Sequence, residues 1–569
     1  MDQSSHQYAR ECQAELEVGV TDVRPPVTRI LMGVFVVVIA AAGAIQRFGT
    51  VSGPNPAPDP AVASPCDPVT MFRDARSVFA TDDGGLMSAV VAANRVVLAG
   101  LRRCEDHLED ESVVGRAIRP TVQSFLARTL GAGNEQVYLG RDGWLFYRPD
   151  VDYVVGPGFL DRSQWARRAA VAVEWRSPPH PDPRPAIIDF RDQLARRNIE
   201  LIVIPTPVKP TMHPEYLASA GLTRLQNRSY REFIGDLEEA GVVVFDAADV
   251  LASLRTARDG PTYLATDTHW RPMAMQRVAS ALAAIIRLRL GLVTRTTGTE
   301  RPATVTVRGR GDLLAMLDVS TDDDHFSREQ VDIHPVGTVA EAPLAVGDVA
   351  SVLLLGDSFS NIYSLATMGW GTGAGLAEQL AFELQQPIDR IIRNDNGAFA
   401  TRDALARELS QGRDRLAGKQ VVLYQFATRE LAFGDWKLIE LPTAPGPAAV
   451  GFVELSAGQS LVITGTIAAA SGVPRPESVP YRDHVRTLHL VDVGVVDGAL
   501  GVSVTDALVY VRSMQDSVWT PAAAWRPGQR LTLRVHAWED VSSDYDGLNR
   551  SELDDERLLL VEPVWGELR

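Results

Sequence analysis

The sequence contains little cysteine, little positive charge and few long apolar runs, and each shortage excludes a class of protein. Three cysteines in 569 residues are too few for a scaffold held by disulfides or for a cysteine-rich zinc site. Acidic residues outnumber basic ones by 72 to 56, giving a net charge of −16, which argues against a nucleic-acid backbone as partner. Only one apolar run is long enough to cross a membrane, so a polytopic membrane protein is excluded.

The overall composition is that of a folded protein. Hydrophobic residues make up 45% of the chain and charged residues 22%, which are values close to globular averages and exclude wholesale disorder. At roughly 150 residues per domain, the length suggests about three or four units.

The single long apolar run extends from Ile30 to Gln46, with Arg29 before it and Arg47 after it. A helix over this run would span roughly 26 Å, and the two arginines could extend to the membrane surfaces. A signal peptide would have a shorter apolar part closer to the N-terminus, and a buried soluble helix is the other alternative. More arginines precede the run than follow it, which favours an N-terminus inside. We expect a cytoplasmic tail over 1–29 and an uncleaved single-pass anchor over 30–46.

A proline-rich stretch follows the expected anchor over residues 47–65. Five prolines among the 17 residues Gly49–Pro65 predict a semi-extended spacer that cannot pack. Cys66 and Cys104 come next, on the expected outer side of the membrane. An oxidising compartment there would allow them to form one disulfide; two unrelated buried thiols are the other interpretation.

Short apolar runs alternate with helical patterns from about residue 185 to 440. Continuous apolar strands separated by helices predict an α/β fold with a doubly wound, mostly parallel sheet. Ligands of such sheets bind outside the carboxyl ends of the strands. The expected strands are Leu201–Ile204, Val242–Phe245, Val352–Leu355 and Gln420–Phe426, and the expected helices are Tyr230–Ala240, Pro272–Leu290, Gly373–Leu384 and Thr401–Leu409.

The pattern changes beyond about residue 440. Short strand patterns separated by Gly, Pro, Asp and Ser predict a small all-β sandwich over 441–569. Four of the ten tryptophans fall in this part. They could form a platform that stacks on sugars, although burial in the sandwich is the default for such side chains.

Two motifs lie at expected strand-to-helix junctions of the sheet. The strand at Val352–Leu355 runs directly into Gly356-Asp357-Ser358, so Ser358 would stand at the carboxyl edge; a helix N-cap is the alternative role. In Asp267-Thr268-His269, residues two apart project together. Asp267 could then orient His269, and His269 could activate Ser358; a structural histidine is the alternative.

Six sequence blocks together resemble one known family. They occur in the order of the SGNH-hydrolase-like domain of the AlgJ/AlgX class of alginate and exopolysaccharide O-acetyltransferases, over roughly residues 70 to 440. Here Asp and His precede Ser, the reverse of the usual SGNH order, and Thr268 replaces the first His of the "DHHW" signature. The blocks are Tyr138–Tyr147, Ile204–Pro210 with Tyr216, Thr266–Trp270, Gly311–Leu313 with Met316–Leu317, Gly356–Ser360 and Gln425–Leu431.

The resemblance implies a catalytic domain over 66–440, with Ser358 as nucleophile, His269 as general base and Asp267 as its orienting carboxylate. It implies acetyl transfer to hydroxyls of an exported polysaccharide on the outer side of the cytoplasmic membrane, in the periplasm or outside the cell. A membrane-bound O-acyltransferase would be the partner that supplies acetyl. The anchor resembles AlgJ, and the C-terminal module resembles AlgX, whose module binds carbohydrate, so 441–569 is a candidate carbohydrate-binding module.

Other residues are weaker candidates. Tyr363 could line the acceptor site, and Lys209 and Arg429 could meet a uronate carboxylate; packing or salt bridging is the alternative for each. Asn394 or Asn396 could donate to an oxyanion, and nothing in their spacing selects one. We expect no cofactor, no metal and no nucleic-acid partner. Two other functions stay open: a carbohydrate esterase of the same fold, and a non-catalytic polysaccharide-binding scaffold of an export complex.

Overall fold

The computed structural model divides the chain into two units, residues 1–53 with 59–119, and residues 54–58 with 120–569. Of the first unit only short pieces are described. The described residues are 32–33, 72–73, 75–76, 87, 90–94, 96–98, 100–101, 113–170, 179–217, 224–256, 260–291, 304–320, 326, 328–336, 350–394, 396–443, 451–474, 476, 479, 481–498, 504–545, 548–553, 555, 558 and 561–568.

The expected anchor lies outside the described residues except for Met32 and Gly33, and Cys66 and Cys104 lie outside them altogether. Within the part of the chain that the structure describes, no helix combines the length and apolar character needed to cross a membrane. The anchor and the disulfide therefore stay predictions.

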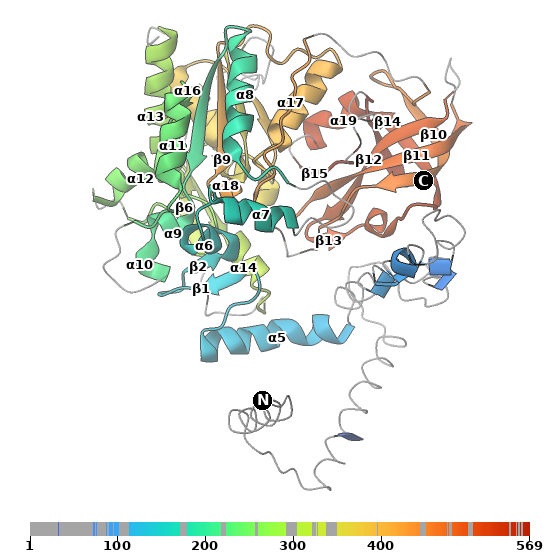
Figure 1. Cartoon of the computed structure of the whole chain (residues 1–569), viewed down its shortest axis with the longest axis horizontal. Coiled ribbons are helices and arrows are strands. Elements are labelled where there is room, and N and C mark those ends of the chain that lie inside the picture. The colour runs from blue at the N-terminus through green and yellow to red at the C-terminus, as the bar shows by residue number, and fades with distance from the viewer. Residues whose placement is uncertain are drawn as a thin grey trace, which may run out of the picture. The chain divides into compact units, whose positions relative to one another are not determined.

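A five-stranded parallel sheet forms the centre of the second unit (Figure 1). Its order is β4-β3-β9-β7-β8, and each neighbouring pair is parallel. This confirms the predicted doubly wound sheet. The strands are β3 (Glu200–Thr206), β4 (Val243–Val244), β7 (Val352–Gly356), β8 (Asp389–Ile392) and β9 (Val421–Ala427).

Helices cover both faces of this sheet, because alternate strand residues point to opposite sides. Ile202, Leu354 and Leu423 pack with α12 (Ala247–Thr256), α13 (Pro272–Leu290) and α16 (Leu376–Leu384). Val203, Leu355 and Tyr424 pack on the other face with a second set of helices. That set is α8 (Pro183–Ala195), α11 (Tyr230–Glu239) and α17 (Ala400–Ser410).

Smaller elements surround the sheet and complete the α/β part. Two two-stranded sheets, β1 with β2 and β5 with β6, are antiparallel. The elements are α5 (Val113–Leu130), β1 (Val137–Leu139), β2 (Leu145–Tyr147), α6 (Arg148–Val155), α7 (Arg162–Ala170), α9 (Lys209–Met212), α10 (Pro214–Leu217), β5 (Val305–Gly309), α14 (Asp312–Met316), β6 (Glu329–Ile333), α15 (Ser358–Asn361), η1 (Ala366–Met368) and α18 (Glu430–Phe433).

The C-terminal part is all-β, as predicted, but its strands do not form two facing sheets. They form one sheet in the order β13-β12-β16-β14-β10-β11-β15, and an additional pairing between β12 and β11 closes it. The expectation of a sandwich over 441–569 is therefore wrong in its arrangement. The strands are β10 (Ser460–Ala470), β11 (His484–Asp497), β12 (Asp506–Gln515), β13 (Val518–Trp519), β14 (Arg530–Ala537), β15 (Asn549–Ser551) and β16 (Val564–Leu568), with η2 (Pro521–Ala524) and α19 (Trp538–Tyr545) between them.

Register shifts between β10 and β11 explain why the sheet closes. The pairing shifts three times between Val462 and Ala469, and such irregularities bend a strand and increase its twist. Trp525, Trp538 and Trp565 are buried in this module and Trp519 is half-buried. Burial, the default interpretation of these tryptophans, therefore holds for three of the four.

Candidate active site

Ser358 lies at the carboxyl edge of the sheet, where β7 gives way to α15. The strand is buried along its whole length, and Asp357 caps the turn by accepting a hydrogen bond from the Phe359 N–H at 2.9 Å. Gln425 on β9 accepts the Asp357 N–H at 3.0 Å. A Cβ on Gly356 would come within 2.4 Å of Ser360 Oγ. Glycine therefore allows the tight turn that places Ser358, and the serine itself is fully buried.

His269 and Asp267 form a hydrogen-bonded pair in the loop before α13. The His269 Nδ1 lies 2.7 Å from Asp267 Oδ1, and the His269 backbone N–H donates to the same oxygen at 3.0 Å. The second Asp267 oxygen accepts from Trp370 Nε1 at 2.8 Å and from the Asp312 N–H at 3.0 Å. Asp267 is thus fixed by four donors, and it in turn fixes the imidazole.

The histidine loop packs directly against the serine turn. The rings of His269 and Phe359 lie 4.8 Å apart, and Phe359 follows Ser358 in the chain. Trp270 Nε1 donates to the Phe359 carbonyl at 3.0 Å, and the Tyr363 hydroxyl donates to the Trp270 carbonyl at 2.7 Å. The structure therefore brings together the two motifs, which are 89 residues apart in the sequence.

Two buried polar atoms of this assembly have no hydrogen-bond partner among the described residues: Ser358 Oγ and His269 Nε2. Because His269 Nδ1 already faces Asp267, its Nε2 is the ring nitrogen left to accept a proton. Buried polar atoms are normally paired, and these two are among several buried side-chain atoms without a partner in the described part of the chain. A serine hydroxyl and a free ring nitrogen are the atoms that a nucleophile and its base would use.

The electrostatics of the site favour an ionised Asp267 beside His269. Burial alone would lower the pKa of His269, but the hydrogen bond and the charge of Asp267 raise it overall. Burial alone would raise the pKa of Asp267, but its bonds from His269 and Trp370 lower it overall. The ionised aspartate therefore stabilises an imidazolium, as acyl transfer requires.

Asp312 is a third acidic group in contact with this pair. Its Oδ2 lies 3.6 Å from His269 Nδ1, and burial together with the charge of Asp267 raises its pKa to about 7. Ligand atoms of Asp267, His269 and Asp312 lie within 4.8 Å of one another. All four carboxylate oxygens accept hydrogen bonds, so the two acids and the imidazole form one hydrogen-bonded network.

Lys209 lies next to this network and holds the histidine loop. Its Nζ donates to the Leu145 carbonyl at 2.6 Å and to the Ala265 carbonyl at 3.1 Å, and it lies 5.4 Å from the centre of the Trp144 ring. Burial lowers its pKa to about 8. Lys209 is fully buried, and its ammonium links β2 to the histidine loop, so the packing interpretation fits this residue.

Arg429 and Tyr363 are also engaged within the protein. Arg429 Nη1 donates to Asp150 Oδ1 at 3.1 Å, and its guanidinium lies 5.5 Å from the centre of the Tyr147 ring. Asp150 is fully buried, and burial raises its pKa. Tyr363 is buried, and its hydroxyl is bonded to Trp270 as described above. The packing interpretation thus fits Tyr363, and the salt-bridge interpretation fits Arg429.

The structure separates the two candidate asparagines. Gly356 on β7 pairs with Ile392 on β8, so Ser358 and Asn394 each lie two residues beyond a paired position. Asn394 is buried, and its Oδ1 accepts from Asn361 Nδ2 at 3.0 Å. Asn396 is exposed and has a positive φ of 51°. Of the two, only Asn394 lies inside the site.

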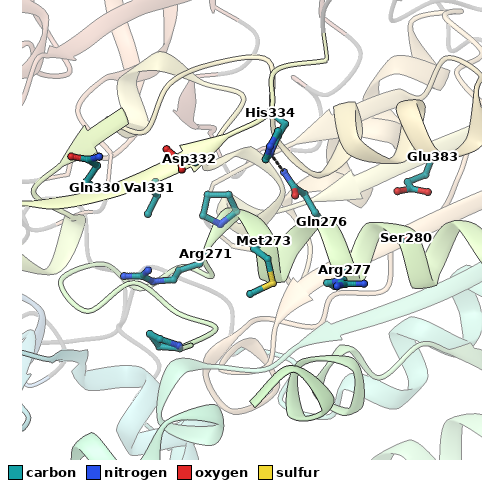
Figure 2. Close-up of a pocket in the computed structure, with 12 residues that line it drawn as sticks. Arg271, Met273, Gln276, Arg277, Ser280, Gln330, Val331, Asp332, His334 and Glu383 are labelled. Atoms are coloured by element: carbon teal, nitrogen blue, oxygen red, sulfur yellow. Dashed lines mark hydrogen bonds between the residues drawn. The ribbon is translucent and has the colours of Figure 1, made fainter. Parts of the chain in front are cut away.

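The pocket in Figure 2 lies outside this site. Its volume is about 650 Å³, and its wall includes the start of α13 and residues of β6, with a hydrogen bond between Gln276 and His334. Arg271, two residues after His269, forms part of the wall, but none of Ser358, His269 and Asp267 does.

Comparison with known proteins agrees with this geometry. The sequence profile of one family, described as the SGNH hydrolase-like domain of acetyltransferase AlgX, matches residues 137–428, which is just over half of the chain. The chain belongs to this family. The matched range begins at β1 and ends beside Arg429, so it contains the whole parallel sheet and all three triad candidates.

Several relatives carry the printed name "Probable alginate O-acetylase AlgJ". The one from Pseudomonas aeruginosa is 32% identical over 157 residues, covering 27% of this chain and 34% of the relative. The one from Pseudomonas syringae pv. tomato is 27% identical over 229 residues, covering 40% and 53%. The chain therefore spans between about a third and a half of the length of these relatives.

Solved structures align with the chain at lower identity. The O-acetyltransferase domain of Pseudomonas putida AlgJ aligns at 21% identity and a TM-score of 0.36, covering 53% of this chain and 93% of that one. Bacillus cereus PatB1 aligns at 14% identity and a TM-score of 0.33, covering 54% and 100%.

Sequence reasoning missed three side chains that contact the candidate site residues or the serine turn. Trp370 donates to Asp267, Gln425 bonds to the Asp357 backbone, and Asp312 contacts His269. Two of the three lay in blocks that carried the resemblance, Gly311–Leu313 and Gln425–Leu431. Trp370 lies in no such block, and no signal in the sequence connects it to Asp267.

Proposed function

We propose that this protein is a membrane-anchored O-acetyltransferase that moves acetyl groups onto hydroxyls of an exported polysaccharide of the alginate kind. The observation that carries the proposal is that Ser358 Oγ and His269 Nε2 are buried without a hydrogen-bond partner among the described residues, while the other nitrogen of the same imidazole is bound by Asp267. Membership of the AlgX-type family supports the reaction class. The printed names of the relatives support a polysaccharide acceptor.

The first half of the reaction loads acetyl onto the protein. Ser358 Oγ attacks the acetyl carbonyl of the donor while His269 Nε2 takes the hydroxyl proton. The tetrahedral intermediate collapses, the bond to the donor's leaving group breaks, and the imidazolium returns its proton to that group. An acetyl-serine and a neutral His269 remain, and Asp267 is ionised throughout.

The second half unloads acetyl onto the sugar. A sugar hydroxyl gives its proton to His269 Nε2 and attacks the acetyl carbonyl, and Ser358 Oγ leaves with the proton returned. The negative charge on the carbonyl oxygen needs preorganised donors. We assign this role to the Ser358 backbone N–H and to Asn394 Nδ2, which in the structure donates weakly to Met368 Sδ at 3.8 Å.

The position of the protein in the cell is part of the proposal. The apolar run Ile30–Gln46 and the proline-rich residues after it support an N-terminal anchor in the cytoplasmic membrane with the catalytic part outside. Acetyl donors of the cytoplasm do not reach that side, so a membrane-bound O-acyltransferase is the proposed partner that supplies acetyl.

The test is acetyl transfer by the full-length chain. The chain is incubated with an activated acetyl ester, with and without a uronate oligosaccharide, and the sugar is analysed by mass spectrometry. Acetyl on the sugar that is lost in Ser358→Ala supports the transferase. If acetate is released in a Ser358-dependent way and the sugar does not change its rate, the protein is an esterase and not a transferase. If no Ser358-dependent turnover occurs, the non-catalytic polysaccharide-binding scaffold is the remaining function.

A further inference from the structure

Asp312 is brought to His269 by a chain segment that crosses the histidine loop. Gly311 precedes it with a φ of +85°, and a Cβ there would lie 2.1 Å from the Thr266 carbonyl oxygen. This close approach allows the Asp312 N–H to donate to Asp267 Oδ2 at 3.0 Å. The side chain of Asp312 points back along the same loop, because its Oδ1 accepts the Thr268 N–H at 2.8 Å.

The carboxyl of Asp312 faces the edge of His269 that Asp267 already uses. Its Oδ2 lies 3.6 Å from His269 Nδ1 and also accepts a hydrogen bond from the Thr268 hydroxyl. Two acidic side chains therefore surround one imidazole nitrogen, and a third residue, Thr268, holds the second acid in place. The triad mechanism uses only Asp267.

We propose that Asp312 is a positioning residue that sets the proton affinity of His269 through the Nδ1 edge of the ring. The proposal rests on the proposed function for the role of His269 as a base. An anionic Asp312 stabilises the imidazolium, and a neutral Asp312 does not. The basicity of His269 therefore follows the charge of its second acidic neighbour.

Four charged or titratable groups face Asp312. Asp267 and His269 come from the histidine loop, Lys209 from α9, and Tyr147 from β2. Burial and the charge of Asp267 oppose the ionisation of Asp312, whereas His269 and the Thr268 hydrogen bonds favour it. The balance leaves its pKa at about 7, so its charge changes within the physiological range.

The test measures how fast a sulfonyl fluoride labels Ser358 in the full-length chain as a function of pH, with mass spectrometry of the labelled peptide. Labelling depends on activation of the serine by its base and needs neither an acetyl donor nor a sugar. In Asp312→Asn, His269 loses an acidic neighbour and becomes less basic. We therefore expect the acid limb of the pH profile to move to lower pH by about one unit, and the labelling rate at the plateau to be reduced.

Two further variants make the test specific. Thr268→Val removes one hydrogen bond that favours the ionised form of Asp312, so we expect a smaller shift in the same direction. Asp414→Asn removes the same charge from an exposed residue that precedes β9, at the other end of the sheet, where it pairs with Arg197. Its profile should coincide with that of the wild type.

An Asp312→Asn profile that is lower at every pH but unmoved along the pH axis would overturn the proposal, because that is the signature of a structural role. A wild-type chain in which the sulfonyl fluoride does not label Ser358 at any pH would also overturn it, because His269 would then not activate the serine. Normal labelling without acetyl transfer to sugar would contradict the proposed function and leave this proposal intact.

Discussion

The side chains around Asp267 differ in which of their polar atoms are already bonded, and this difference assigns their roles. Asp267 accepts four hydrogen bonds and Lys209 donates to two carbonyls, whereas Ser358 Oγ and His269 Nε2 have no partner among the described residues. The bonded groups hold the loop in place, and the two unpaired atoms are the ones to which the proposed function gives the chemistry.

Replacing Asp267 by asparagine should separate geometry from charge. The amide keeps the shape of the side chain but removes the charge that stabilises the imidazolium and can hold the wrong tautomer of His269. We expect acetyl transfer to fall by about 10³- to 10⁴-fold, with the circular dichroism spectrum unchanged. An undiminished rate would show that Asp267 does not orient the base.

Lys209 predicts a pH effect on stability. Its pKa is about 8 when folded, below its ordinary value of 10.5, so between these two values the unfolded chain binds more protons at this residue. The contribution of Lys209 to the free energy of unfolding therefore rises with pH across this window. Thermal unfolding at several pH values should show the wild type gaining stability relative to Lys209→Met from about pH 8 upward; a constant or falling difference would contradict the assignment.

At the scale of elements, strands and helices with strong apolar patterns were predictable. The helix Pro272–Leu290 has the predicted bounds, with Pro272 in its first turn and Gly291 in the left-handed conformation at its end. β8 was missed because it begins with Asp389 and Arg390, and only two of its four residues are apolar. Asp389 is buried there in ion pairs with Arg415 and Lys419, which a pattern of apolar residues does not reveal.

The site was predictable only in part for the same reason. Residue order and spacing indicated Asp267, His269 and Ser358, because their motifs fall at strand ends of one sheet. The bonds of Asp267 to Trp370 and Asp312 join segments up to 103 residues apart in sequence and depend on how the loops fold over the sheet edge. Lys209 was a candidate for contact with a uronate carboxylate, with packing or salt bridging as the alternative, and its position after β3 does not reveal that its side chain turns inward.

The attachment of the closed sheet to the α/β part depends on α17. Arg407 donates to the Tyr510 hydroxyl at 2.9 Å and lies 3.2 Å from Glu552. Burial would raise the pKa of Glu552, but Arg407 and Arg550 lower it to about 2. Arg407→Met removes the main partner of that half-buried carboxylate and should cost about 1.5–3 kcal/mol in urea unfolding.

Arg413, just after α17, supplies the control: it pairs with Glu562, but its side chain is 40% exposed, against 11% for Arg407. Arg413→Ala should cost less than about 1 kcal/mol. Equal decreases in the free energy of unfolding for the two variants would mean that the burial of the arginine does not determine how much its ion pair contributes to stability.

At the scale of the whole molecule, the family domain occupies residues 137–428, and the predicted anchor and spacer precede it. We expect the full-length chain to remain with membranes after extraction at alkaline pH. Val36→Asp combined with Val38→Asp places two charges in the apolar run, where each is costly in a bilayer, and should release the chain. Retention of this variant would contradict the anchor.

The central claim, a covalent acetyl-serine that is passed on to a sugar, is tested most directly by trapping it. The full-length chain would be treated with an activated acetyl ester without acceptor, and the peptide containing Ser358 analysed by mass spectrometry before and after addition of a uronate oligosaccharide. We predict one acetyl group on Ser358 that disappears as acetyl appears on the sugar. An acetylated sugar formed with Ser358 replaced by alanine would contradict the account.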